Sequence, residues 1–385
     1  MKRLTLLLIL PSFVILASSF AAEQRPNVLF IAVDDLRTSL GCYGDTLVKS
    51  PNIDRFAASA RRFEHAYTQQ AVCGPSRTSL LTGRLPDNTR VWHNRNLFRD
   101  TQPGIVTLPQ LFRNHGYHTV SLGKIFSGDQ RELDPASWSE PEILKQKGWK
   151  NSALGDSGGK GKGAAWEAAD VPDEGYPDGK LARLAVEQLT GLQSGGKPFF
   201  LAVGFFKPHL PFNAPKRYWD LYDLATFDLK DDGQRVKGIS EHAHHSHREL
   251  GGYRDMPKDE RLDAATTRIL RHGYHACVSY TDAQIGKLLV ALDQLGLAQN
   301  TIVVLWGDHG WSLGEKDRWC KGTNFERDTR VPLLIRTPGL LAPGAAASGL
   351  VELVDVFPTL AELASLPAPQ GLDGRSLVPM LANPQ

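Results

Sequence analysis

Four short apolar runs constrain the fold more than any other feature of this sequence. Each run is continuous rather than alternating, which is typical of parallel strands buried on both faces. Helix-length segments separate the runs, as they do in chains built from alternating strands and helices. The four runs are Val28–Val33, Thr119–Leu122, Phe199–Phe206 and Ile302–Trp306. The sequence therefore predicts an α/β fold with a large, mostly parallel central sheet flanked by helices on both faces.

The connecting segments contain stretches with apolar residues at helical spacing. We expect one helix to open at Ser79–Leu81, after a turn fixed by Pro75 and Ser76. The other expected helices are Asn52–Arg62, Leu181–Leu192 and Ala264–Leu295.

Every apolar run leads into charged side chains. In open α/β sheets, ligands bind just outside the carboxyl ends of the parallel strands. The charged residues that follow the four runs are Asp34 and Asp35, Lys124, Lys207 and His209, and Asp308 and His309. We therefore expect these four strand ends to converge on one polar site.

The N-terminus has the pattern of an export signal. Lys2 and Arg3 precede an apolar stretch that runs from Leu4 to Leu16, and small residues follow up to Ala22. We expect residues 1–22 to be a signal peptide and residues 23–385 to form the catalytic domain of a periplasmic or secreted protein, free of the membrane after cleavage. A membrane anchor is the alternative, but Pro11 interrupts a run already short for a bilayer span.

Charge and cysteine content exclude other classes. The 44 basic and 42 acidic residues leave a net charge of +2, which gives no electrostatic footprint for nucleic acid. The 4 cysteines lack a C-x-x-C spacing and are too few for a disulfide framework. We interpret Cys42, Cys277 and Cys320 as buried thiols, with a disulfide between two of them as the alternative. Cys73 differs from these three because of the residues that follow it.

The segment Cys73–Arg84 reads CGPSRTSLLTGR. It resembles the sulfatase signature, C-x-P-S-R followed by L-T-G-R, in which a separate maturation enzyme oxidises the cysteine to formylglycine. The resemblance, to sulfatases of the iduronate-2-sulfatase type, extends from about Pro26 to about Leu381 and includes PNVLFIAVDDLRTSLGCYGD and GDHGWSLGEKDRWCKGTNF. It implies the alkaline-phosphatase-like sulfatase fold and a sulfated sugar as substrate, for which we expect a 2-sulfated uronate.

A hydrated formylglycine carries two hydroxyls on one carbon, which no encoded side chain offers. In the mechanism that the resemblance implies, one hydroxyl attacks the ester sulfur and the other later expels sulfate, so Cys73 is the nucleophile. Arg77 would hold this diol and the neighbouring carboxylates in place.

The resemblance also implies a metal site and its partners. Carboxylate oxygens favour Ca²⁺ or Mg²⁺ over Zn²⁺, and the family selects Ca²⁺. Lys124, His209 and Lys321 match the positions that bind the sulfate, with His209 suited to protonate the leaving alcohol. The implied metal ligands are Asp34, Asp35, Asp308, His309 and the modified Cys73.

Two departures from the family pattern stand out. Sulfatases usually place a histidine two or three residues after the strand-end lysine, whereas this chain has Ser127 there. Either Ser127 replaces it poorly or another histidine does its work. The chain also ends soon after DGRSLVPML, so we expect a C-terminal small subdomain to be missing or truncated.

Two polar segments read as insertions. The stretches 155–163 and 231–258 are poor in apolar residues and are expected to build no core. The tract 241–247, EHAHHSH, lies in the second of them. Its spacing does not define a tetrahedral site, so we interpret it as a solvated segment rather than a metal site.

Two other functions remain open at this point. A phosphoester or phosphonate hydrolase of the same superfamily would share the sheet and the metal carboxylates but would normally lack the complete cysteine signature. A non-catalytic sugar-binding protein would result if Cys73 were never matured or if the truncation disabled turnover.

Overall fold

The computed structural model describes residues 25–127, 134–143, 163–227, 229, 235–240, 243, 249–258 and 261–384. The expected signal peptide, residues 155–162 of the first expected insertion and most of the histidine tract lie outside these ranges. Among the helices described, none is both long and apolar enough to cross a membrane.

The central sheet is mixed but mostly parallel, which confirms the predicted fold class. Its strand order is β10-β2-β9-β7-β1-β5-β3, with β8 paired to β2. The four apolar runs are neighbours in the middle and on one side of this sheet, and their pairings with one another are parallel, whereas β7 also pairs antiparallel with β9. The strands are β1 (Asn27–Val33), β2 (Arg61–Tyr67), β3 (His118–Gly123), β5 (Phe199–Phe205), β7 (Thr301–Gly307), β8 (Arg330–Val331), β9 (Leu333–Arg336) and β10 (Ala346–Glu352). Strands β4 (Trp166–Glu167) and β6 (Phe212–Asn213) form a separate small sheet.

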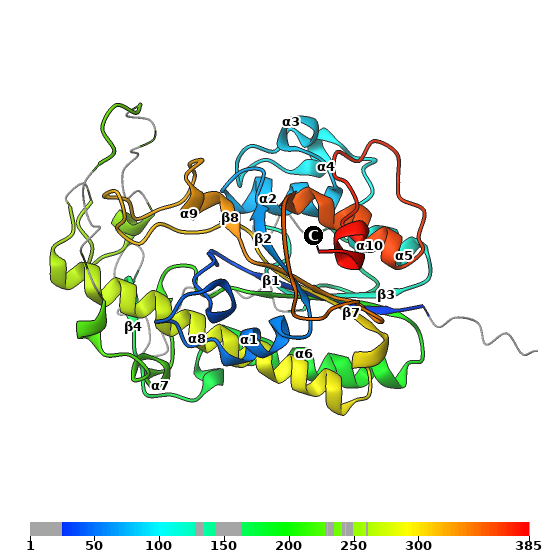
Figure 1. Ribbon diagram of the computed structural model, residues 1–385, viewed down its shortest axis with the longest axis horizontal. Helices are drawn as coiled ribbons and strands as arrows, with labels where there is room; N and C mark the ends of the chain where they lie inside the picture. Colours follow the sequence, from blue (N-terminus) through cyan, green and yellow to red (C-terminus); the bar gives the residue numbers. More distant parts are fainter. Residues whose placement is uncertain are drawn as a thin grey trace, which may run out of the picture.

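Helices cover both faces of the sheet (Figure 1). The long helix α8 lies with α1 and α6 on one face, and α2, α5 and α10 lie on the other. The helices are α1 (Pro51–Ala57), α2 (Cys73–Thr82), α3 (Pro86–Thr89), α4 (Phe98–Thr101), α5 (Leu108–Asn114), α6 (Pro177–Ser194), α7 (Lys216–Trp219), α8 (Ala264–Gln294), α9 (Glu326–Thr329), α10 (Val356–Leu363) and α11 (Val378–Ala382).

Two hydrophobic cores explain why the apolar runs are continuous. In β1, Leu29, Ile31 and Val33 belong to the core under α1, α6 and α8, while the alternate residues Phe30 and Ala32 belong to the core under α2, α5 and α10. Because successive side chains of a strand point to opposite faces, a strand covered on both faces needs apolar residues at every position.

Two helix boundaries differ most from the prediction, and α6 also begins four residues before the expected Leu181. The helix expected over Asn52–Arg62 ends at Ala57, and Arg61 begins β2 instead. The guanidinium of Arg61 is buried and donates to the carbonyls of Leu341 and Leu381, contacts that only the tertiary fold supplies. Helix α2 begins at Cys73, before Pro75, because a proline in the first turn forfeits no helical hydrogen bond.

The end of the 231–258 segment does build core, contrary to the prediction. Leu250 and Tyr253 are 1% and 3% exposed and pack into the core that contains α8. These two apolar side chains are too few to be noticed in the composition of the segment, which is why composition alone was misleading.

Candidate active site

The strand ends of β1 and β7 bring four predicted site residues together. Val33 pairs with Gly307 at the last position of the two strands, so Asp34 and Asp35 emerge beside Asp308 and His309. The backbone N–H of Asp308 donates to the Val33 carbonyl at 3.3 Å. All four side chains are buried, with exposed fractions of 0–1%.

Cys73 lies against this group at the first residue of α2. Its Sγ is 3.2 Å from Nε2 of His309 and 3.6 Å from Oδ1 of Asp34. Burial raises the pKa of the Cys73 thiol to about 11, although Lys124 and Lys321 act in the opposite direction. The unmodified thiol is therefore protonated at neutral pH and is a poor nucleophile as it stands.

Arg77 joins the two acidic strand ends from one turn further along α2. Its Nε donates to Asp308 Oδ2 at 2.8 Å, and its Nη2 lies 3.3 Å from Asp34 Oδ1. Its Nη1 donates to the carbonyls of Lys124 and Ile125. Every nitrogen of this fully buried guanidinium thus faces an oxygen, which offsets the cost of burying its charge.

Two lysines approach the acidic pair from opposite segments. Lys124, which follows β3, donates to Asp34 Oδ2 at 2.6 Å. Lys321, from the loop between β7 and α9, donates to Asp35 Oδ1 at 2.7 Å. Gly204 in β5 permits the first approach, because a Cβ there would collide with the backbone of Lys124.

The two aspartates differ in their electrostatic balance. Burial alone would raise the pKa of Asp34, but Lys124, His209 and Arg77 hold it well below its ordinary value. Burial raises the pKa of Asp35 well above its ordinary value, because Lys321 and His309 compensate only in part. The ionised form of Asp35 therefore calls for a further positive charge nearby.

The backbone conformation and hydrogen bonding of Asp35 suit a metal ligand. Its backbone has a left-handed φ of 59°, which is costly for a residue with a side chain, and its N–H donates to Asp308 Oδ1 at 3.0 Å. Among the described residues, its buried Oδ2 has no hydrogen-bond partner. A buried carboxylate oxygen in that state fits a metal ion, because a cation would satisfy it.

Two overlapping groups of side chains could hold such an ion. In each group the donor atoms lie within 4.8 Å of one another. The groups are Asp34, Asp35, Cys73 and His209, and Asp34, Cys73, Asp308 and His309. Carboxylate oxygens supply two of the four donors in each group, and oxygen ligands suit a hard cation such as Ca²⁺ or Mg²⁺.

His309 presents a ring nitrogen to Cys73. Its Nδ1 donates to the Gly310 carbonyl at 3.0 Å, which leaves Nε2 directed at the Cys73 sulfur. His309 is therefore an imidazole in contact with Cys73. It is a candidate for the role of the histidine that the sequence lacks near Ser127.

His209 completes the site on its more open side. Its Nδ1 donates to the Leu210 carbonyl at 2.6 Å, and its Nε2 lies 3.9 Å from Asp35 Oδ2. Burial, with Lys321 acting in the same direction, lowers the pKa of His209 to about 4, although the nearby Glu249 opposes this shift.

Glu249 is the residue of this cluster that the sequence did not reveal. Its Oε1 lies 3.1 Å from His209 Nε2 and its Oε2 lies 3.4 Å from Lys321 Nζ. Glu249 lies in a segment that reads as a polar insertion, so no local pattern distinguishes it from a solvated glutamate. The buried Leu250 directly after it was the one available signal.

The remaining cysteines carry no disulfide. Cys42, Cys277 and Cys320 form no disulfide, and Cys277 and Cys320 are buried, so the interpretation as buried thiols holds for these two, while Cys42 is partly exposed.

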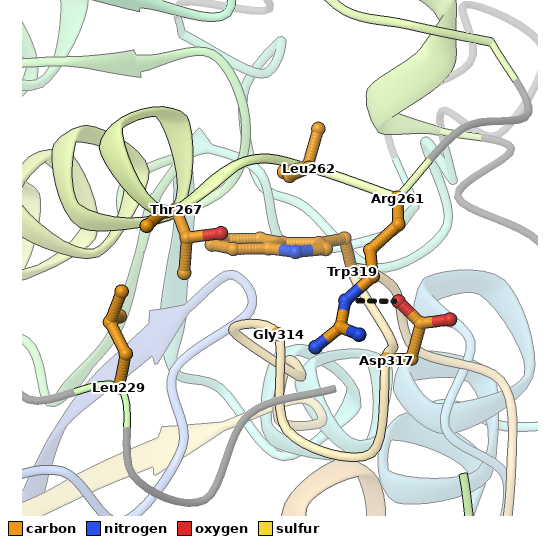
Figure 2. Close-up of a pocket in the computed structure, with 8 residues that line it drawn as sticks. Leu229, Arg261, Leu262, Thr267, Gly314, Asp317 and Trp319 are labelled. Atoms are coloured by element: carbon orange, nitrogen blue, oxygen red, sulfur yellow. Dashed lines mark ion pairs between the residues drawn. The ribbon is translucent and has the colours of Figure 1, made fainter. Parts of the chain in front are cut away.

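A separate pocket of about 300 Å³ lies beside the loop that carries Lys321. Figure 2 shows the Trp319 indole on its wall and the ion pair between Arg261 and Asp317, which join at 3.9 Å. None of the predicted site residues lines this pocket. This pocket is therefore separate from the cluster that contains Cys73, Asp34, Asp35 and Asp308.

Comparison with known proteins gives a consistent assignment. A family model described as Sulfatase matches residues 26–366. The chain is 39% identical to iduronate 2-sulfatase of Mus musculus, over 96% of this chain and 74% of the mouse protein.

Solved structures share the fold. The phosphonate monoester hydrolase from Silicibacter pomeroyi aligns with a TM-score of 0.76 and 25% identity, covering 93% of this chain and 76% of that one. A protein solved in complex with its substrate D-glucosamine-2-N,6-O-disulfate aligns with a TM-score of 0.73 and 25% identity, covering 94% of this chain and 81% of that one. With the family match over most of its length, the chain belongs to the sulfatase family, enzymes that hydrolyse sulfate esters.

Proposed function

We propose that this sulfatase removes sulfate from a sulfated sugar, with a 2-sulfated uronate as the leading substrate, using Ca²⁺ and a formylglycine made from Cys73. The observation that carries the proposal is the position of Cys73. Its sulfur lies at the N-terminus of α2, between Asp34 and His309, in a cluster that also contains the buried Lys124 and the partly buried Lys321.

The chemistry of Cys73 supports its conversion. A buried thiol whose pKa is raised to about 11 supplies almost no thiolate at neutral pH. A formylglycine hydrate would instead offer one hydroxyl to attack sulfur and a second to release the sulfate. The thiol sulfur occupies the place that those hydroxyls would take.

The metal would be held by Asp34, Asp35, Asp308 and His309, with the modified Cys73 alongside. When bound, Ca²⁺ would supply positive charge that binds the sulfate and stabilises the ionised nucleophile. Arg77 keeps Asp34 and Asp308 in place through its two ion pairs.

The remaining side chains have separate tasks. Lys124 and Lys321 are placed to bind sulfate oxygens that gain negative charge during transfer. His209 in its protonated form would donate the Nε2 proton to the departing alcohol and keep the Nδ1 proton on the Leu210 carbonyl, and the negative charge of a bound sulfate ester would favour that protonated form.

Similar proteins support the sugar substrate. The mouse relative is named for 2-sulfated iduronate, and a solved relative was captured with a sulfated glucosamine. The signal-like N-terminus supports a periplasmic or secreted enzyme, where sulfated polysaccharides are encountered.

Sulfate release tests the proposal. The protein is co-expressed with a formylglycine-generating enzyme, conversion of Cys73 is measured by peptide mass, and sulfated mono- and disaccharides, including 2-sulfated uronates, are assayed with Ca²⁺. We expect release that Cys73→Ser abolishes. Absence of release from fully converted protein would contradict the proposal.

The likeness to a phosphonate monoester hydrolase favours one alternative. Phosphonate monoesters therefore belong in the same panel. Faster turnover of a phosphonate than of every sulfate ester would assign the site to that chemistry instead.

A further inference from the structure

We propose that Asp328 is a positioning residue that holds Lys321 in place to bind the sulfate group. The inference rests on the proposed function, because it presupposes that Lys321 contacts sulfate oxygens. Asp328 belongs to neither of the groups of side chains in the described part of the chain that could hold a metal ion. It acts on the site through the loop between β7 and α9, and it was not among the predicted site residues.

The Asp328 carboxylate is fully buried and binds both arms of this loop. Its Oδ1 accepts from the hydroxyl of Ser312 at 2.9 Å, on the arm that follows β7. Its Oδ2 accepts from Arg318 Nη2 at 2.6 Å and from the hydroxyl and the N–H of Thr323 at 2.6 and 3.1 Å, on the arm that returns to α9. A buried carboxylate that loses such donors is costly, so these contacts keep the two arms together.

These contacts fix the backbone on both sides of Lys321. Arg318 lies three residues before Lys321 and Thr323 lies two residues after it, and both bind the same carboxylate oxygen. The carbonyl of Cys320, directly before Lys321, accepts from the N–H of Ser312 at 2.9 Å. A lysine side chain is long and flexible, so its ammonium reaches a defined position only when its backbone is held.

The ammonium of Lys321 lies where a sulfate oxygen can still reach it. Its Nζ donates to Asp35 Oδ1 at 2.7 Å, lies 3.4 Å from Glu249 Oε2 and lies 5.1 Å from the centre of the Trp311 ring. Trp311 is fully buried and belongs to the arm of the loop that its neighbour Ser312 ties down. An ammonium carries three N–H donors, so two carboxylates leave one donor for the sulfate.

Asp328 acts through geometry rather than through charge. It forms a buried ion pair with Arg318 at 2.6 Å. A change that removes its negative charge would, by electrostatics alone, strengthen the binding of an anion such as sulfate. Displacement of the Lys321 ammonium has the opposite effect, so the direction of the change in sulfate affinity separates the two explanations.

Isothermal titration calorimetry with inorganic sulfate, on matured protein in the presence of CaCl₂, tests the inference. Lys321→Ala should weaken sulfate binding at least about 10-fold, because it removes a charged hydrogen-bond donor. Asp328→Asn should weaken it about 5-fold, although the variant carries one negative charge fewer. Tighter or unchanged binding of sulfate by Asp328→Asn would overturn the inference.

Thr323 provides a second, milder test that does not depend on the folding of Asp328→Asn. Thr323→Val removes the hydroxyl that donates to Asp328 and should weaken sulfate binding about 3-fold, whereas Thr323→Ser keeps a hydroxyl and should bind like wild type. Thr329→Val is the matched control. The Thr329 hydroxyl donates to the Phe325 carbonyl at 3.2 Å, so its removal should leave sulfate affinity unchanged.

A double-mutant cycle shows whether the effect passes through Lys321. In the Lys321→Ala background, Thr323→Val should cause no further loss of sulfate affinity, because the side chain that Asp328 positions is gone. A full loss in that background, or equal affinities for Thr323→Val and Thr323→Ser, would contradict the inference. Wild-type protein that binds no inorganic sulfate would overturn it as well, whereas converted protein that binds sulfate but hydrolyses no ester would overturn only the proposed function.

Discussion

Asp308 shows how one buried carboxylate can organise an active site. Its Oδ2 accepts from Nε of Arg77 at 2.8 Å, and its Oδ1 accepts the backbone N–H groups of Asp35 and His309 at 3.0 and 2.9 Å. This one side chain therefore connects α2 with the ends of both central strands and also faces the candidate metal position.

Asp308→Asn should weaken Ca²⁺ binding at least about 10-fold, because an amide keeps the shape but loses the charge. Isothermal titration calorimetry with CaCl₂ measures this directly. Asp328→Asn is a suitable control, since Asp328 is an equally buried carboxylate paired with Arg318 at 2.6 Å outside the cluster. Unchanged affinity in Asp308→Asn would exclude Asp308 as a ligand.

At the scale of elements, the loop between β7 and α9 carries Lys321 into the site and depends on Glu315. Glu315 accepts from Arg37 at 2.8 Å and from the N–H of Leu313 at 2.6 Å, and it lies 3.2 Å from Arg327. Burial alone would raise the pKa of Glu315, but the arginines lower it to about 2.

This shift makes the loop contribute to stability in a pH-dependent manner. A carboxyl with a lowered pKa stabilises the fold fully above its unfolded pKa, about 4.5, and the contribution disappears as pH falls toward 2. Glu315→Gln should lower the free energy of unfolding by roughly 3 kcal/mol at pH 6, and the difference should shrink below pH 4.5.

Urea unfolding of both proteins between pH 6 and pH 3 tests this, using roughly half-unit steps. Glu187→Gln, which removes an exposed partner of Arg183, should track wild type throughout. A constant difference between Glu315→Gln and wild type over the whole range would contradict the ionic explanation.

At the scale of the whole molecule, the candidate metal site connects segments far apart in the sequence. Asp34 follows β1, Cys73 begins α2, and Asp308 follows β7. All three meet at the carboxyl ends of the two central strands β1 and β7. A ligand that binds only the folded state stabilises all of these elements together.

Calcium should therefore raise the melting temperature. At a free concentration about 100 times Kd, the expected stabilisation is about 2.7 kcal/mol, which corresponds to a shift of a few °C. Scanning calorimetry with CaCl₂ and with EDTA measures the difference, and Asp308→Asn should show about half of it or less, since a 10-fold weaker affinity leaves about 1.4 kcal/mol at the same calcium concentration. Equal melting temperatures under both conditions would argue against calcium at this site.

The sequence alone predicted the central part of the fold. Continuous apolar runs such as Val28–Val33 can be satisfied only between two layers of helices, so the strands and the location of Asp34, Asp35 and Asp308 at their ends followed from local pattern. Where the pattern was ambiguous, as at Arg61, the prediction continued a helix into what is a strand.

Other features were decided by contacts between distant segments. Arg77 pairs with both Asp34 and Asp308 because the fold brings the three side chains together. The raised pKa of Asp35 and the lack of a hydrogen-bond partner for its Oδ2 likewise depend on which groups surround this buried carboxyl. Glu249 is the clearest case, because a glutamate in a polar segment has the same local pattern whether it faces water or His209. Sequence determined which chemical groups this protein carries and which strands bear most of them, whereas tertiary packing decided which charges share a low-dielectric space, since that depends on distance in three dimensions.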